Sequence, residues 1–518
     1  MDNPLKIVNT AEKHRKYQMF YKPNIVYWGL GIENELYLEF DQKIKIPMSF
    51  FEKNHRRERY SIDYFANYKS SVLARAFDEF NKFVPAVGIG DLELPILINS
   101  HSFTHGDQSN QPETLYTSRL IRNPKFSGTV LIDFLKKSDT YFANTMDLNW
   151  LFDGDTIEFT TLNFFNGNLP AIIDELEKSK MEFIKHINDS FQREKLFETY
   201  GPVKIMELNH DFAIHLTNLD NISMFNNGTL HYNITLPTKL DSNAEIVDFQ
   251  SFTKTHQLAI KYIQWLEPLL IAVYGSPDPF SKLSTTFLNK RAFSASSQRC
   301  AVSRYISIGT YDSDEMVRGK YLTEKISNLK LNHCDHWWYT NYHKHSAYST
   351  LIELGLDINF NKHYNHGIEL RFFDHITDSN KIKESFEFII YLMDFVLDKF
   401  ITIINPIYEK SWNNLVIGTL TYGRDYALTV GEKNQFDKLF GVVFTNNIAG
   451  HLYNEIYEYL VSSYGKKYKR NNVYYRKPIG PFSSLVLTTE IIGNIKLNRN
   501  SVSKYILATK KAIKNYFK

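Results

Sequence analysis

The clearest periodic pattern near the start of the chain is an alternation of apolar and polar residues over residues 28–40. Successive side chains of a strand point to opposite faces, so Glu33, Glu35 and Glu39 would share one face, while leucine, isoleucine and phenylalanine residues take the other. Aligned carboxylates repel one another unless they lie in water or bind a cation. We therefore expect a cation beside this strand.

The same division into an apolar and a polar face recurs over residues 155–161, 228–236 and 366–375. Such alternation predicts strands with one core face. For any single strand, a polar face in contact with solvent is the commoner explanation, but four matching strands indicate an antiparallel sheet with one functional face. That face would carry Glu33, Glu35, Glu158, His231, Asn233, Glu369 and Arg371.

These polar residues form a hard ligand set. Several carboxylates and one imidazole, with no thiolate among them, suit Mg²⁺ or Mn²⁺ better than a closed zinc site. The sequence contains no glycine-rich motif of the kind that cradles phosphate, because Gly88-Ile89-Gly90 lacks the third glycine and the strand-to-helix context. A bound nucleotide would therefore be held neither by a P-loop nor by a dinucleotide fold.

Apolar residues at helical spacing predict helices over residues 171–191, 256–273 and 386–407. Acidic and basic residues interrupt the last of these segments, which indicates a buried amphipathic helix rather than a membrane span. From residue 381 onward the pattern is mainly helical.

These elements predict an α+β fold: a curved antiparallel β-sheet with the active site on its concave face, helices packed on the other face, and a helical C-terminal region. Residues 20–380 would form the catalytic domain, and residues 381–518 a mainly helical extension packed on it. Residues 92–98 read as a short strand, which Pro95 would confine to a sheet edge.

Composition narrows the classes of partner. The 60 basic and 57 acidic residues give a net charge of +3, so there is no general electrostatic reason to expect nucleic acid or an anionic membrane. The 2 cysteines are too few for a disulfide framework, and no charged and then apolar leader opens the sequence. We expect a reducing, cytoplasmic setting.

Two other segments carry weaker signals. Metal-binding side chains crowd residues 333–345, but their spacing fits no closed four-ligand zinc pattern and aromatic neighbours suggest packing. Residues 466–477 are basic and contain tyrosines, which would suit nucleic acid or an acidic peptide, although a solvated hinge is the commoner explanation. The side chains of the first segment are His333, Cys334, His336, His343 and His345.

The ordered strands resemble the glutamine synthetase and glutamate-cysteine ligase superfamily of carboxylate-amine ligases, which also contains the amidoligases and the guanidino kinases. Gly31-x-Glu33-x-Glu35 looks like the opening metal-binding strand of that superfamily, and Glu369-x-Arg371 looks like its closing Glu-x-Arg strand. Residues 155–161 resemble its Glu-Thr strand, and residues 228–236 its Gly-x-x-His-x-Asn strand. The resemblance covers residues 25–376.

The resemblance implies a role for each matching residue. Glu39 has no match and is expected at the rim or in solvent. Arg371 would face the transferring phosphate, Arg304 is a candidate catalytic residue, and His231, Asn233, Arg299 and Arg304 are candidates for nucleotide binding. The implied metal ligands are Glu33, Glu35, Glu158, His231 and Glu369.

The implied activity is ATP- and Mg²⁺-dependent formation of an amide bond through an acyl phosphate, with a γ-glutamyl product among the candidates. Such chemistry needs neutralisation of phosphate oxygens more than covalent help. The substrates would be a small-molecule or peptide carboxylate and an amine. Two alternatives stay open: a guanidino kinase, and a catalytically silent member of the fold that binds a protein or a nucleic acid.

Overall fold

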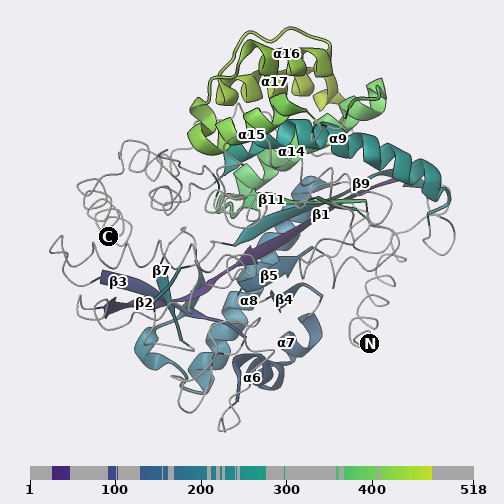
Figure 1. Cartoon of the computed structure of the whole chain (residues 1–518). Coiled ribbons are helices and arrows are strands. Elements are labelled where there is room, and N and C mark those ends of the chain that lie inside the picture. Colours follow the sequence, from purple (N-terminus) through teal and green to yellow (C-terminus); the bar gives the residue numbers. More distant parts are fainter. Residues whose placement is uncertain are drawn as a thin grey trace, which may run out of the picture.

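The computed structural model describes residues 26–46, 92–100, 102, 129–146, 148–153, 156–161, 168–206, 212–216, 222–224, 228–239, 241, 246–275, 297, 358–360, 367–404, 406 and 409–468. Within these ranges the chain forms two sheets and a set of helices (Figure 1). The predicted α+β class is therefore confirmed.

The larger sheet has six strands in the order β10-β11-β9-β1-β5-β4, and every neighbouring pair is antiparallel. The four strands predicted from alternation are β11, β9, β1 and β5, which are direct neighbours in this sheet. Antiparallel pairing keeps their matching faces on one side of the sheet. The strand bounds are β1 Val26–Leu36, β4 Trp150–Asp153, β5 Thr156–Thr160, β9 Thr229–Lys239, β10 Ile358–Phe360 and β11 Ile368–Asp374.

The smaller sheet has five strands in the order β6-β2-β3-β7-β8, with one parallel pair, β3 and β7. The chain passes from the first sheet to the second at Tyr37, between the end of β1 and the start of β2. The strand predicted over residues 28–40 is therefore divided between two sheets. The strand bounds are β2 Leu38–Ile46, β3 Leu92–Ile98, β6 Val203–Ile205, β7 Phe212–His215 and β8 Ile222–Met224.

The prediction that Pro95 confines β3 to an edge is wrong, because β3 lies between β2 and β7. Pro95 lies opposite Lys43, where the register between β2 and β3 shifts after Glu39. The pairing with β7 involves Ile96 and Leu97 and does not reach the proline. Proline cannot donate to the ladder, and this irregularity lets a central strand accommodate it.

Three long helices cover the apolar face of the larger sheet: α8 Leu169–Arg193, α9 Phe249–Tyr274 and α14 Ser379–Lys399. The Tyr232 ring stacks on Phe386 of α14 at 4.4 Å between centroids, and the Tyr232 hydroxyl donates to the Ile382 carbonyl. Phe159 of β5 packs edge-on against Phe183 of α8. These contacts leave the opposite face of the sheet for the polar residues.

The predicted helices begin and end at capping residues. Asn168 caps α8 by accepting from the Ala171 amide, and Asp378 caps α14 by accepting from the Asn380 amide. The helix α9 begins at Phe249, seven residues before the predicted start, and Asp248 is its N-cap. Most residues of its first two turns are polar, so this segment carries little apolar periodicity although Phe252 is buried.

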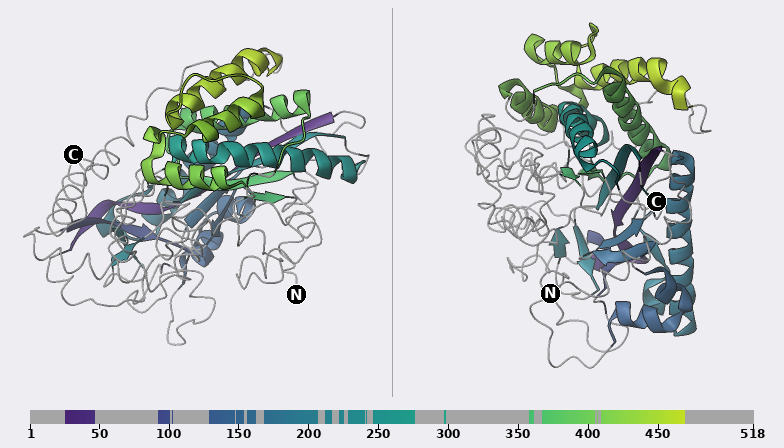
Figure 2. Two further views of the ribbon diagram at one scale, coloured as in Figure 1. Left: turned by 45° about the horizontal axis from the view of Figure 1, so that its top comes forward. Right: turned by 90° about the vertical axis from the view of Figure 1, so that its right-hand side faces the viewer.

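The helices α15 Lys410–Tyr422, α16 Val430–Phe440 and α17 Ala449–Tyr468 lie beyond α9 and α14, on the side away from the sheet (Figures 1 and 2). The Trp412 indole of α15 donates to the Gln264 carbonyl of α9 at 2.7 Å. The mainly helical character predicted after residue 381 is confirmed for the described residues up to 468. The division at residue 380 stays a prediction.

The remaining described helices are shorter. They are α6 Leu131–Ser138, α7 Thr140–Thr145 and the 3₁₀ turns at Glu198–Tyr200 and Gly423–Asp425. Along α8, contacts reach β1 and β5 of the larger sheet and β6 of the smaller one, so this helix braces both sheets. None of the helices in the described part of the chain is both long enough and apolar enough to span a bilayer.

Candidate metal centre

Strand register brings the predicted site residues together across the middle of the larger sheet. Glu33 of β1 lies opposite His231 of β9, and Asn233 of β9 lies opposite Glu369 of β11. Directly opposed residues of antiparallel strands share a face and approach within side-chain contact. The site is thus a consequence of pairing four strands in this order.

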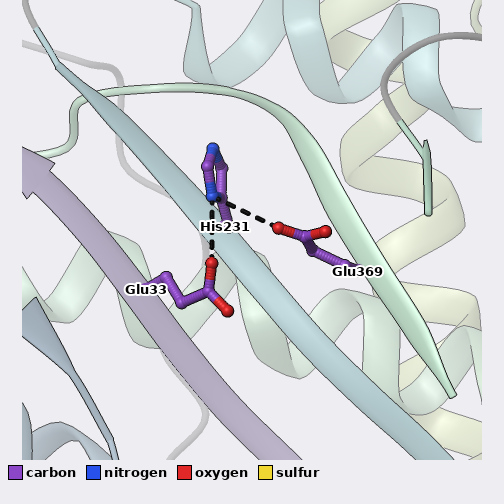
Figure 3. Close-up of side chains that lie close together, drawn as sticks. All are labelled: Glu33, His231 and Glu369. Atoms are coloured by element: carbon purple, nitrogen blue, oxygen red, sulfur yellow. Dashed lines mark hydrogen bonds and ion pairs between the residues drawn. The ribbon is translucent and has the colours of Figure 1, made fainter. Parts of the chain in front are cut away.

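The first cluster consists of Glu33, His231 and Glu369, which are all buried (Figure 3). The His231 Nδ1 atom lies 3.4 Å from Glu33 Oε2 and 3.6 Å from Glu369 Oε1. Figure 3 shows both carboxylates reaching the same ring nitrogen from the strands on either side. One potential ligand atom from each residue lies within 4.8 Å of the other two, a spacing that could hold a metal ion.

The second cluster consists of Glu35, Asp153 and Glu158, whose nearest ligand atoms also lie within 4.8 Å of one another. Glu35 of β1 is directly opposite Glu158 of β5. Asp153, the last residue of β4, was not predicted as a site residue. The strand β4 is too short to show alternation. The signal that could have placed Asp153 beside β5 is the sequence Asp153-Gly154-Asp155-Thr156, which is typical of a hairpin connection and whose first and last residues pair.

Thr229 lies between the two clusters. Its hydroxyl donates to Glu35 Oε2 at 2.6 Å and lies 3.0 Å from His231 Nε2. The preceding Gly228 has a φ of +81°, and a Cβ added there would meet the Glu35 carbonyl oxygen at 2.2 Å. Only glycine allows the start of β9 to approach β1 this closely.

Two polar side chains support the first cluster. Asn233 donates from Nδ2 to Glu33 Oε1 at 3.0 Å, and its buried Oδ1 has no hydrogen-bond partner among the described residues. Arg371 donates from a guanidinium nitrogen to Glu369 Oε1 at 2.7 Å and is itself buried. Arg371 follows Leu370, where the β11–β9 register becomes irregular. Both residues hold a carboxylate in place.

The electrostatics of the site follow from burial and from the carboxylates. Burial lowers the pKa of His231, the Arg371 charge lowers it further, and Glu35, Glu33 and Glu369 act in the opposite direction. His231 is therefore neutral at pH 7, the state in which imidazole binds a metal. For Arg371 burial alone would lower the pKa, but Glu369, Glu35 and Glu33 outweigh it and raise the pKa.

The residues present fit a divalent cation that prefers oxygen ligands. The two clusters contain five carboxylates and one neutral imidazole. The positively charged side chain of Arg371 lies beside them and pairs with Glu369. Such a donor set suits Mg²⁺ or Mn²⁺. Without a cation, directly opposed carboxylates such as the half-buried Glu35 and the buried Glu158 would repel one another.

Other predicted residues fall elsewhere. Glu39, expected at the rim or in solvent, is 7% exposed and lies in β2 of the smaller sheet, with Oε1 3.8 Å from Lys204 Nζ. The prediction is wrong because the change of sheet at Tyr37 separates Glu39 from the other two glutamates. Arg299, Arg304, the cluster at residues 333–345 and residues 469–477 lie outside the described residues.

No family model matches the chain, but a curated protein sequence and a solved structure are similar to it. A protein of Acanthamoeba polyphaga mimivirus, "Uncharacterized protein R704", is 35% identical over 419 residues, which cover 80% of this chain and 71% of that protein. Among solved structures, the complex of the prokaryotic ubiquitin-like protein Pup with its ligase PafA aligns over 93% of this chain and 79% of that chain, with 12% identity and a TM-score of 0.28. At this TM-score the likeness carries no argument about the present chain.

Proposed function

The chain belongs to the family of the mimivirus protein R704, and we propose that it is an ATP- and Mg²⁺-dependent carboxylate-amine ligase. The observation that supports this proposal is the meeting of two cation-ligand clusters on one face of an antiparallel sheet, with Arg371 beside them. The resemblance of the four strands to that superfamily of ligases adds to it.

The two clusters would hold the metal ions. Glu33, His231 and Glu369 would ligate one ion, and Glu35, Asp153 and Glu158 another. When bound, Mg²⁺ supplies neutralisation of the phosphate oxygens of ATP, which lowers the barrier to attack by an anionic carboxylate.

The reaction would proceed in two steps. In the first, an oxygen of the substrate carboxylate forms a bond to the terminal phosphorus of ATP while the bond from that phosphorus to the bridging oxygen breaks, giving an acyl phosphate and ADP. In the second, the amine nitrogen bonds to the acyl carbon, the carbon–oxygen bond to phosphate breaks, and the nitrogen loses a proton. The products are an amide, ADP and phosphate.

The side chains of this chain would position and neutralise these groups. Arg371 would offer a guanidinium to the transferring phosphoryl group while it holds Glu369. The buried Oδ1 of Asn233, which has no partner within the described part of the chain, is an acceptor on the strand that carries His231. The γ-glutamyl type of product, the small-molecule or peptide substrates, and the roles of Arg299 and Arg304 stay predictions from the resemblance.

Thermal melting with and without Mg-ATP tests the proposal. A ligand that binds the folded state raises the melting temperature by mass action. We expect Mg-ATP to raise the melting temperature of the wild-type chain, and the double variant Glu33→Gln, Glu369→Gln to lose that gain. Glu194→Gln, an exposed residue at the end of α8, is the matched control and should keep the gain.

A phosphate-release screen then identifies the reaction. Amino acids, polyamines and short peptides serve as paired carboxylate and amine substrates. A ligase releases phosphate only when both partners are present. A guanidino kinase would instead form a phosphoguanidine without releasing phosphate. If Mg-ATP does not change the melting temperature of the wild-type chain, the ligase hypothesis is refuted and a catalytically silent binding protein is favoured.

A further inference from the structure

We propose that Thr229 is a positioning residue that fixes the His231 ring with Nδ1 toward the first cation and connects the two clusters. This inference rests on the proposed function, because it takes the carboxylates and His231 to be cation ligands. Thr229 lies opposite Glu35 in the strand register and two residues before His231, so it shares a face with both. It is 1% exposed, which excludes bulk water as a substitute for its contacts.

When the carboxylates ligate cations, the hydrogens between Glu35, Thr229 and His231 can be assigned in one way. A carboxylate that ligates a cation is ionised and accepts hydrogen bonds without donating them. The single hydroxyl hydrogen of Thr229 must then point to Glu35 Oε2, at 2.6 Å. The hydroxyl oxygen can only accept from His231 Nε2, at 3.0 Å, so Nε2 carries the ring hydrogen.

In the cation-bound state the other ring nitrogen, Nδ1, is then the one that carries no hydrogen. His231 Nδ1 lies 3.4 Å from Glu33 Oε2, a long hydrogen-bond distance that a ring hydrogen on Nδ1 would also satisfy, and 3.6 Å from Glu369 Oε1. With the ring hydrogen on Nε2, these three atoms can act together as ligands of one cation, while Arg371 still donates to Glu369 Oε1 (Figure 3). Thr229 thus determines which ring nitrogen is offered to the metal.

The same hydroxyl couples the clusters. Glu35 belongs to the second cluster and His231 to the first, and Thr229 contacts both. A change in Glu35 is therefore transmitted to the orientation of His231 through two hydrogen bonds. Loss of the hydroxyl should weaken binding at the first cluster although Thr229 touches no cation itself.

The test compares Thr229→Val, which keeps the shape and removes the hydroxyl, with Thr229→Ser, which keeps the hydroxyl. Mn²⁺ alone is titrated into the full chain without nucleotide, and free Mn²⁺ is measured by electron paramagnetic resonance. We expect Thr229→Val to bind Mn²⁺ about 10 to 100-fold more weakly than wild type, and Thr229→Ser to stay within about threefold. The exposed His451→Gln is the matched histidine control and should bind as wild type does.

A second readout does not depend on the Thr229 variants. The ring nitrogens of ¹⁵N-histidine in the wild-type chain saturated with Mg²⁺ report the tautomer, and His231→Gln assigns the signal. We expect hydrogen on Nε2. Hydrogen on Nδ1, or wild-type affinity in a folded Thr229→Val, overturns the role of Thr229 while the proposed function stands. A wild-type chain that binds no Mn²⁺ overturns the proposed function as well.

Discussion

Glu35 on β1 and Glu158 on β5 face each other directly across the antiparallel register of the larger sheet. Like charges in this relationship destabilise a sheet, and Asp153 adds a third carboxylate at the same place. Without metal, repulsion between these carboxylates destabilises the folded protein. Once a divalent cation binds between them, each carboxylate is attracted to the cation. The pair therefore predicts opposite effects of one substitution in the two states.

Glu158→Gln should stabilise the metal-free chain and weaken its response to metal. Removing one of two opposed charges should raise the free energy of unfolding by about 0.5 to 1 kcal/mol without divalent ions. The rise in melting temperature that Mn²⁺ gives the wild type should shrink, because a ligand is lost. Chemical denaturation with and without Mn²⁺ measures both effects, and a variant that is destabilised in the metal-free state would contradict the prediction.

Arg371 should matter both to stability and to rate. Arg371→Ala breaks a buried ion pair from one side and should lower the free energy of unfolding by about 3 to 5 kcal/mol. Arg371→Lys keeps the charge but loses the planar fork, so it should fold while phosphate release falls roughly 100-fold. Arg193→Ala, which removes an exposed arginine paired with the half-buried Asp139, is the control, with a loss below about 1 kcal/mol. Equal losses for Arg193→Ala and Arg371→Ala would count against this account.

Gly228 and Gly441 form a matched pair of left-handed glycines. Both have positive φ, but a Cβ at Gly228 would meet the Glu35 carbonyl oxygen at 2.2 Å, whereas Gly441 has nothing within 4 Å. Gly441→Ala should cost about 1 to 2 kcal/mol for the conformation alone. Gly228→Ala should cost clearly more and should weaken Mn²⁺ binding, since β1 must move at Glu35. Denaturant melts of the two variants give the comparison, and equal costs would show that the close approach is unimportant.

Glu387 should make the stability of the chain depend on pH. Burial in α14 raises the pKa of this carboxyl from 4.5 to about 8, although Lys383 and a hydrogen bond from Tyr457 of α17 act against the shift. Between these values the folded chain holds a proton that the unfolded chain has released. This contribution to the free energy of unfolding is therefore fully present below pH 4.5 and is lost as the pH rises through about 8.

Glu387→Gln tests this, because glutamine stays neutral at every pH. Urea denaturation across this range should show that the free energy of unfolding falls less steeply in the variant than in the wild type. The exposed Glu458→Gln of α17 is the control and should keep the wild-type slope. If the two variants and the wild type have the same slope, Glu387 is not the group responsible.

Much of the fold could be predicted because periodicity is a local property of the chain. Alternation around Glu33, His231 and Glu369 gave three of the strands, and helical spacing gave most of α8 and α14. Alternate residues of a strand point to opposite faces, so polar residues such as Asn233 could be assigned to a face from the sequence of that strand alone. Alternation does not reveal where one sheet ends and another begins, which is why Glu39 was misplaced.

Tertiary structure decided which polar faces meet. The sequence by itself determined an α+β chain whose strands carry carboxylates, an imidazole and an arginine on one face. The pairing order, the β4–β5 pairing that adds Asp153, and the distances that divide the ligands into two clusters joined by Thr229 depend on contacts between residues as far apart as Glu33 and Glu369. Such contacts are set by register and packing across the whole sheet, and no local pattern encodes them.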